Sequence, residues 1–150
     1  MNKKKLISII GLILLLIIVA YFQLDLNQPS ANPQGTELAE DGYYSTPEDV
    51  ALYIHTYGRL PANFITKSEA QELGWDNSKG NLWEVADQLS IGGDRFGNRE
   101  GLLPDDPGRV WYECDVNYAG GYRGPERIVF SNDGLIYYTD DHYESFTRLY

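Results

Sequence analysis

Apolar and polar residues alternate with a period of two along the C-terminal third of the chain, and this pattern predicts β-strands. Residues 110–116 show it first, and residues 127–130 repeat it. The polar stretch 131–134 predicts a turn into a further strand at 135–138, so these two strands are expected to form a hairpin. A last short strand is expected at 145–149.

The strand at 110–116 has two distinct faces, because successive side chains of a strand point to opposite sides of the sheet. Glu113 lies on the face with polar neighbours, and Cys114 lies on the opposite face, where it is expected to be a small apolar core residue. His142 falls in the polar connection 140–143. Antiparallel pairing of the strands could bring this histidine to Glu113.

Glu113, Arg123, Arg127 and His142 together suit chemistry that moves two protons around a phosphate. An unperturbed glutamate titrates near ~4.3 and a histidine near ~6.5, so at intermediate pH one accepts a proton and the other donates one. Arginine offers planar, permanently charged groups that fit phosphoryl oxygens. The same residues also fit an ordinary surface salt-bridge ladder beside a loop histidine, and spacing alone leaves both interpretations open.

Helices are predicted before the strands. Thr46 is an N-cap candidate followed by a proline and two acidic residues, and Gly58 ends the helix after an apolar stripe. Helices followed by an antiparallel sheet predict one α+β domain, with the main helix packed on one face of the sheet and the ligand bound on the other. Two shorter helices are expected to open with capping-box patterns, Thr66 with Glu69 and Asn81 with Glu84.

The N-terminal segment is predicted to target the chain for export. Three lysines at 3–5 precede the uncharged run 6–24, as in a signal peptide. This run is close in length to the roughly 20 residues that cross a bilayer, and no clean small-residue cleavage site follows it, so residues 1–24 are a signal peptide or a membrane anchor. The polar composition of residues 25–42 predicts a disordered linker or pro-segment before a domain at 43–150.

Several ordered fragments of the predicted domain carry a resemblance to a known family. In chain order they are ITKSEAQ at 65–71, LGW at 73–75, SKGNL at 78–82, SIGGD at 90–94, NREG at 98–101 and DHY at 141–143. They resemble the barnase and binase family of secreted, guanine-preferring bacterial ribonucleases, with no insertion or deletion across residues 44–150. The resemblance implies the microbial ribonuclease fold, N-terminal helices packed on a C-terminal antiparallel β-sheet, in a monomer.

The resemblance also implies an activity: an extracellular endoribonuclease that cleaves single-stranded RNA on the 3′ side of guanosine. Glu113 would take the proton of the 2′-OH, and His142 would protonate the departing 5′-oxygen, giving a 2′,3′-cyclic phosphate that is then hydrolysed. Lys67, Arg123 and Arg127 would stabilise charge on the phosphoryl oxygens. No cofactor is needed, because the nucleophile belongs to the substrate.

The stretch 90–101 is rich in glycine, so its backbone can approach a ligand closely and present N–H groups. By the resemblance, Glu100 and the amides around Asn98 and Arg99 would read the edge of guanine. Phe96 and Tyr143, and Tyr122 as a further candidate, would offer stacking faces. Without the resemblance, a glycine-rich β-bulge with a solvated glutamate explains the same residues.

The chain departs from the family pattern in charge and at two glycines. Residues 43–150 carry nine basic and 18 acidic side chains, a net charge of −9, whereas the family members are basic. Long-range attraction for RNA is therefore expected to be weak or repulsive. Gly97 stands in place of a serine in the guanine loop, and Gly134 stands in place of a tryptophan at a turn expected near His142.

Other interpretations concern partners and metals. A catalytically silent, membrane-tethered RNA-binding module of the same fold is the rival to an enzyme, although every expected acid, base and phosphate-contact position is filled. A barstar-like inhibitor protein is a possible partner, but the acidity of the domain makes electrostatic pairing uncertain. Asp105 and Asp106 fall in a turn without histidine or cysteine neighbours, so no metal site is predicted.

Overall fold

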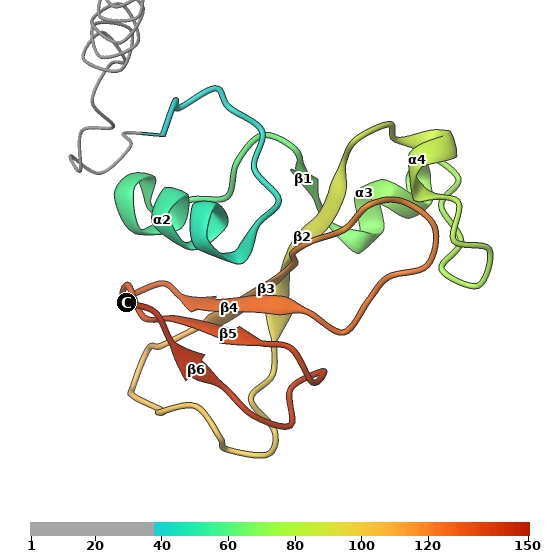
Figure 1. The fold of residues 1–150 in the computed structure, drawn as a ribbon. Coiled ribbons are helices and arrows are strands. Elements are labelled where there is room, and N and C mark those ends of the chain that lie inside the picture. The colour runs from blue at the N-terminus through green and yellow to red at the C-terminus, as the bar shows by residue number, and fades with distance from the viewer. Residues whose placement is uncertain (1–37) are drawn as a thin grey trace, which may run out of the picture. The chain divides into compact units, whose positions relative to one another are not determined.

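The computed structural model describes residues 38–150, and the predicted signal or anchor at 1–24, with most of the predicted linker, lies outside the described residues. Helices precede a largely antiparallel sheet (Figure 1), so the predicted α+β class is confirmed. None of the helices in this part is long and apolar enough to cross a membrane. The elements are α2 Pro47–Tyr57, β1 Phe64–Ile65, α3 Lys67–Glu72, α4 Leu82–Val85, β2 Ser90–Phe96, β3 Trp111–Asp115, β4 Arg127–Ser131, β5 Ile136–Thr139 and β6 Thr147–Arg148.

The main helix, α2, begins and ends where local chemistry predicts. The Thr46 hydroxyl accepts a hydrogen bond from the Asp49 amide, and Gly58 takes the left-handed conformation with its N–H bonded to the carbonyl of Ile54. The apolar stripe of α2 packs on the sheet, on the face that carries Cys114, which is buried as predicted. This helix therefore covers one face of the sheet and leaves the other to the remaining loops.

The six strands follow the chain order in the sheet, β1-β2-β3-β4-β5-β6. β1 is parallel to β2, and every other neighbouring pair is antiparallel. The predicted hairpin is present as β4 and β5, and the last strand is shorter than the predicted span 145–149. Register places Glu113 between Asp94 of β2 and Val129 of β4, at the centre of the sheet.

The two shorter helices differ in how they begin. Thr66 and Glu69 form the predicted capping box at the start of α3. The capping box predicted for Asn81 and Glu84 is wrong, because the Asn81 side chain makes no cap hydrogen bond. It accepts instead from the Asp76 amide and donates to the carbonyl of Gly74, so it closes the loop before α4.

Glu113 is less exposed than the alternating pattern suggests. Its side of the sheet carries a small core of its own, built on Leu103, Trp111 and Val129, with Phe96 and Tyr143 packed against it. Glu113 therefore has apolar neighbours beside the polar ones expected from the sequence. The period of two shows which side a residue faces, but the loops that cover that side come from distant parts of the chain.

Two further placements differ from the sequence-based expectation. Residues 38–42, assigned to the linker, contact α2, since the hydroxyls of Tyr57 and Tyr53 donate to the carbonyls of Leu38 and Glu40. The turn that contains Gly134 is not near His142, because it joins β4 to β5 at one end of the hairpin and His142 follows β5 at the other end.

Candidate active site

Glu113, at the centre of β3, is the residue around which the candidate site is built. Its Oε1 accepts a hydrogen bond from Lys67 Nζ at 2.6 Å, and its Oε2 accepts one from the hydroxyl of Tyr143. Only 8% of Glu113 is exposed to solvent. A carboxylate oxygen can accept more than one hydrogen bond, so both oxygens keep acceptor capacity for a ligand.

The pKa of Glu113 reflects two opposing effects. Burial would raise its pKa, but the hydrogen bonds from Lys67 and Tyr143 and the charges of Lys67 and Arg127 outweigh burial and hold the pKa below its ordinary value. The same contact acts in the opposite direction on Tyr143, whose pKa is raised by burial and by its hydrogen bond to Glu113. Glu113 is therefore a carboxylate at neutral pH and can act as a base.

Lys67 reaches Glu113 because its helix is attached to the neighbouring strand. It is the first residue of α3, directly after the capping residue Thr66. Its backbone N–H donates to Oδ2 of Asp94 at 2.9 Å, and Asp94 is the cross-strand neighbour of Glu113. Asp94 thus fixes the start of α3 over the sheet. Sequence reasoning missed this residue, and only its position just after the glycine pair of β2 could have drawn attention to it.

Arg123 and Arg127 share one buried carboxylate. Asp115 accepts two hydrogen bonds from Arg123, from Nε at 2.6 Å and from Nη2 at 2.7 Å. Arg127 Nε lies 2.9 Å from Oδ1 of Asp115 without the alignment of a hydrogen bond, so this contact is an ion pair. Asp115 was also missed, although its position two residues after Glu113 places it on the same face of β3.

His142 lies in the loop between β5 and β6. His142 and Tyr143 both have positive φ angles, 56° and 75°, so the loop holds them in a conformation that non-glycine residues seldom adopt. Asp141 anchors this loop: hydrogen bonds from the Ser145 side chain and backbone, and from Thr139, lower the pKa of Asp141 to about 2.

The structure brings His142 to the arginines rather than into contact with Glu113. His142, Arg123 and Arg127 line one hollow of about 400 Å³. The imidazole ring centroid lies 4.8 Å from that of Tyr143, whose hydroxyl reaches Glu113. Tyr143 therefore contacts both the predicted acid and the predicted base.

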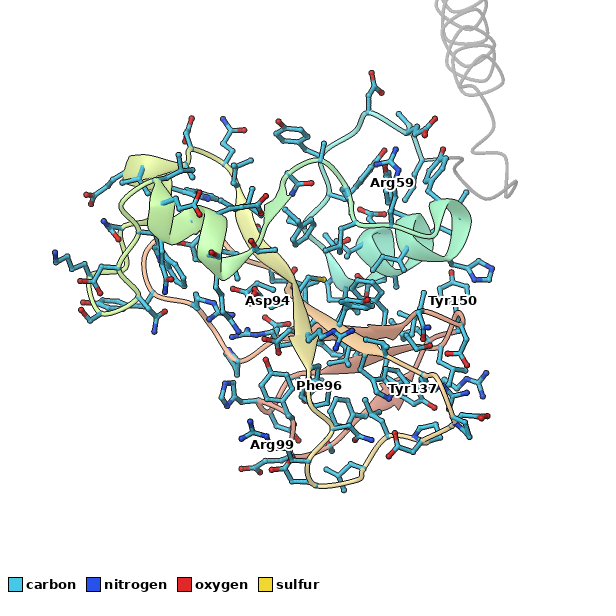
Figure 2. The ribbon with its side chains drawn as sticks, turned by 180° about the vertical axis from the view of Figure 1, so that it is seen from behind. Arg59, Asp94, Phe96, Arg99, Tyr137 and Tyr150 are labelled. Carbon is cyan, nitrogen blue, oxygen red and sulfur yellow. The ribbon has the colours of Figure 1, made fainter. Side chains whose placement is uncertain are left out.

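A second hollow, of about 490 Å³, begins at the end of β2 and contains Phe96, Asn98, Arg99 and Glu100. We call it the base pocket, because it contains the residues that the resemblance assigns to the reading of guanine. Figure 2 shows Asp94, Phe96 and Arg99 following one another along β2 into the loop that borders it. The Phe96 ring lies 5.1 Å from that of Tyr143, so Tyr143 links this pocket to Glu113. Tyr122, also considered for stacking, is exposed and does not line the pocket.

The loop of the base pocket is built around Asn98. The Asn98 side chain accepts from the Leu103 amide and donates to the Leu103 carbonyl, and Asn98 has a positive φ of 43°. Within the described residues, the backbone N–H groups of Arg99 and Glu100 have no hydrogen-bond partner, and both residues are exposed. The loop thus presents two donors and a carboxylate to the pocket.

No group of three or more histidine, cysteine, aspartate or glutamate side chains that could hold a metal ion occurs in residues 38–150. Asp105 lines the base pocket, whereas Asp106 pairs with Arg109 at 3.8 Å. The polar groups of the site are thus carboxylates, guanidinium groups, an ammonium group, an imidazole and amides, a set suited to binding a phosphate and transferring protons.

Comparisons with known proteins agree with this chemistry. A sequence model of the ribonuclease family matches residues 47–150. A ribonuclease of Bacillus intermedius is 50% identical over 135 residues, covering 87% of this chain and 83% of that protein. A ribonuclease of Heyndrickxia coagulans is 56% identical over 105 residues, covering 70% of this chain and 96% of that protein. Guanyl-specific ribonuclease St of Saccharopolyspora erythraea is 46% identical over 52 residues, covering 34% of this chain and 52% of that protein. The chain belongs to the ribonuclease family, and within it to the barnase and binase type.

Proposed function

We propose that this protein is an endoribonuclease that cleaves single-stranded RNA on the 3′ side of guanosine. The observation that carries the proposal is the position of Glu113, an ionised carboxylate joined through Tyr143 to both the base pocket and His142. A guanosine held in the base pocket would place its 2′-OH and 3′-phosphate near this carboxylate. The guanyl-specific relative supports the choice of base.

Glu113 acts as the general base of the first step. It accepts the proton of the 2′-OH, the 2′-oxygen attacks the adjacent phosphorus, and the bond to the 5′-oxygen of the next nucleotide breaks. His142 donates a proton to that departing oxygen, which leaves a 2′,3′-cyclic phosphate. In the hydrolysis that follows, His142 takes a proton from water and Glu113 returns one to the 2′-oxygen. The lowered pKa of Glu113 supports this assignment, because the base is ionised at neutral pH.

Lys67, Arg123 and Arg127 stabilise the charge on the phosphoryl oxygens during both steps. The two guanidinium groups are held by Asp115 and are already oriented before RNA binds, so little reorganisation is needed during the reaction. DNA lacks the 2′-OH and therefore binds without reacting by this route.

Guanine is read in the base pocket by groups that match its edge. The Glu100 carboxylate accepts from the N1–H and N2–H of guanine, and the unpartnered amides of Arg99 and Glu100 donate to O6. Adenine offers neither the pair of adjacent donors nor the O6 acceptor. Phe96 provides an aromatic wall for stacking.

We further propose that the enzyme acts outside the cytoplasm. The export signal at 1–24 implies a secreted enzyme, or one held on the outer face of the cytoplasmic membrane if the segment is not cleaved. Free RNA outside the cell is then the substrate, and a barstar-like inhibitor is a candidate partner. The protein acts as a monomer without a cofactor.

Cleavage of short dinucleotides tests the proposal. The full-length protein is given GpC, ApC and CpC in the presence of EDTA, beside Glu113→Gln and His142→Ala, with Glu72→Gln on the exposed side of α3 as a matched control. Cleavage of GpC through a cyclic phosphate, lost in both site variants and kept in the control, supports the enzyme. A folded protein that binds GpC and cleaves no dinucleotide would instead favour the silent RNA-binding module.

A further inference from the structure

The sheet carries another hollow, of about 330 Å³, on the face opposite Glu113 and beside the C-terminal end of α2. Its walls include Tyr112 and Phe130 from the sheet, Gly58 from the end of α2, and Asn132 and Gly134 from the β4–β5 turn. Its volume is at the lower end of the roughly 300–1,000 Å³ range of small-molecule sites. The proposed cleavage reaction makes no use of it.

Two aromatic rings form the wall of this hollow. Tyr112 and Phe130 are paired residues of β3 and β4, and their ring centroids are 5.7 Å apart with an interplanar angle of 29°. Both side chains are half-buried, and Ile54 and His55 from the last turns of α2 line the same hollow. A side chain at Gly134 would have no atom within 4 Å of its Cβ, so the hollow stays open on the side of the turn.

Residues that line the hollow are direct neighbours of residues that line the base pocket. Arg95 lines the base pocket and is also the cross-strand partner of Tyr112, so its side chain lies on the same face as the two rings. A pair of hydrogen bonds joins Val110, which lines the base pocket, to Asn132, which lines the hollow. Arg95 is exposed and makes no ion pair among the described residues, so its guanidinium group is available to an anion.

We propose that this hollow binds the nucleobase of the nucleotide on the 5′ side of the guanosine, and that Arg95 contacts the phosphate between them. The inference rests on the proposed function, because the base pocket gives the position of the guanosine. The 3′-phosphate of that guanosine would face Glu113, so the 5′ end of the strand would leave the pocket on another side. Arg95 lines the pocket and is the cross-strand partner of Tyr112, so it lies on the side of the hollow.

The charge of the domain makes a stacking site of this kind useful. With a net charge of −9 over residues 43–150, long-range attraction contributes little to RNA binding. Base stacking on an aromatic side chain depends little on net charge, and it is worth about fivefold in affinity per base at the lower end of its range. Stacking on Tyr112 and Phe130 therefore supplies affinity that the acidic surface does not.

The experiment measures cleavage of three substrates by the full-length protein. They are GpC, ApGpC, and an analogue of ApGpC in which an abasic spacer takes the place of the first nucleotide. The measured quantity is the ratio of kcat/KM for ApGpC to that for GpC. We expect a ratio of about five, arising in KM, with most of this gain in kcat/KM lost for the abasic substrate. Tyr112→Leu brings the ratio close to one, and Arg95→Gln lowers it and weakens its dependence on salt. Tyr43→Leu, an exposed tyrosine outside both hollows, keeps the wild-type ratio.

The outcomes separate this inference from the proposed function. Cleavage of GpC with equal kcat/KM for GpC and ApGpC overturns the inference and leaves the proposed function in place. Failure to cleave GpC overturns the proposed function itself. If the abasic substrate shows the same increase in kcat/KM over GpC as ApGpC does, or if Tyr112→Leu keeps the wild-type ratio, no base stacks in the hollow. A concentration-dependent dimer that Tyr112→Leu abolishes would assign the hollow to a second copy of the chain.

Discussion

Replacement of Asp115 by asparagine removes the charge that holds both site arginines. The Asp115 side chain is 3% exposed, and the side chains of Arg127 and Arg123 are 4% and 15% exposed, so solvent replaces the lost carboxylate only in part, at Arg123. Asparagine has nearly the same shape, but it offers one acceptor oxygen in place of two and no charge. The change therefore leaves two guanidinium groups in the interior without their counter-ion.

The size of the effect follows from this burial. Removal of one partner from a buried ion pair costs about 3–5 kcal/mol of stability. The lower value of about 3 kcal/mol applies to Asp115→Asn. One reason is that Arg127 keeps hydrogen bonds to the carbonyls of Gly124 and Glu126, and another is that Arg123 has access to water. A loss of this size is a large fraction of the roughly 5–15 kcal/mol that stabilises a typical domain.

Urea unfolding measures this loss, followed by circular dichroism and by tryptophan fluorescence. Glu40→Gln is the control, because it breaks the pair of Glu40 with Arg59, whose side chains are 67% and 50% exposed, and is expected to cost less than about 1 kcal/mol. Cleavage of GpC by folded Asp115→Asn is expected to fall by at least about tenfold, since the two arginines are no longer oriented. Equal, small losses of stability in both variants, with full activity, would refute the account of Asp115.

Four further outcomes are expected from the same structure. Lys67→Met removes the strongest group that lowers the pKa of Glu113, so the acidic limb of the pH profile of kcat/KM moves to higher pH. Tyr143→Phe keeps the ring but loses a hydrogen bond to the carboxylate, and kcat/KM for GpC falls by about tenfold. Thr66→Ala removes the capping hydroxyl of α3 and lowers the unfolding free energy in urea by about 1 kcal/mol. Activity on long RNA declines only shallowly with added salt, and a steep loss of kcat/KM between low and moderate salt would contradict the role given to the acidic surface.

The parts of the fold that local chemistry determines could be predicted from the sequence. Both ends of α2 follow from Thr46 and Gly58, because an N-cap hydroxyl and a left-handed glycine act within one turn of the helix. The capping box of Thr66 and the β4–β5 hairpin are local in the same sense. Asn81 shows the limit, because it has the residue type of a cap but bonds to the preceding loop instead.

The parts that depend on register and on distant loops could not be predicted. Asp94 and Asp115 hold Lys67 and the arginines, but these roles appear only once β2, β3 and α3 are placed side by side. The burial of Glu113 likewise depends on loops far away in the sequence, which supply Leu103 and Tyr143. Gly134 was assigned to the wrong end of the hairpin, because sequence distance to His142 is short although the hairpin separates them.

The charges within the site are compatible with the proposed binding of a phosphate by an acidic domain. Three cations, Lys67, Arg123 and Arg127, are already paired with two carboxylates, Glu113 and Asp115, so the group as a whole attracts RNA only weakly at long range. At short range each cation is fixed by its carboxylate, and a phosphate that arrives meets donors that need no reorganisation. The rate at which RNA meets the protein is therefore expected to gain little from charge, and affinity has to come from contacts made after the two have met. The proposed base reading by the loop at Glu100 and the proposed stacking on the opposite face of the sheet would be contacts of that kind.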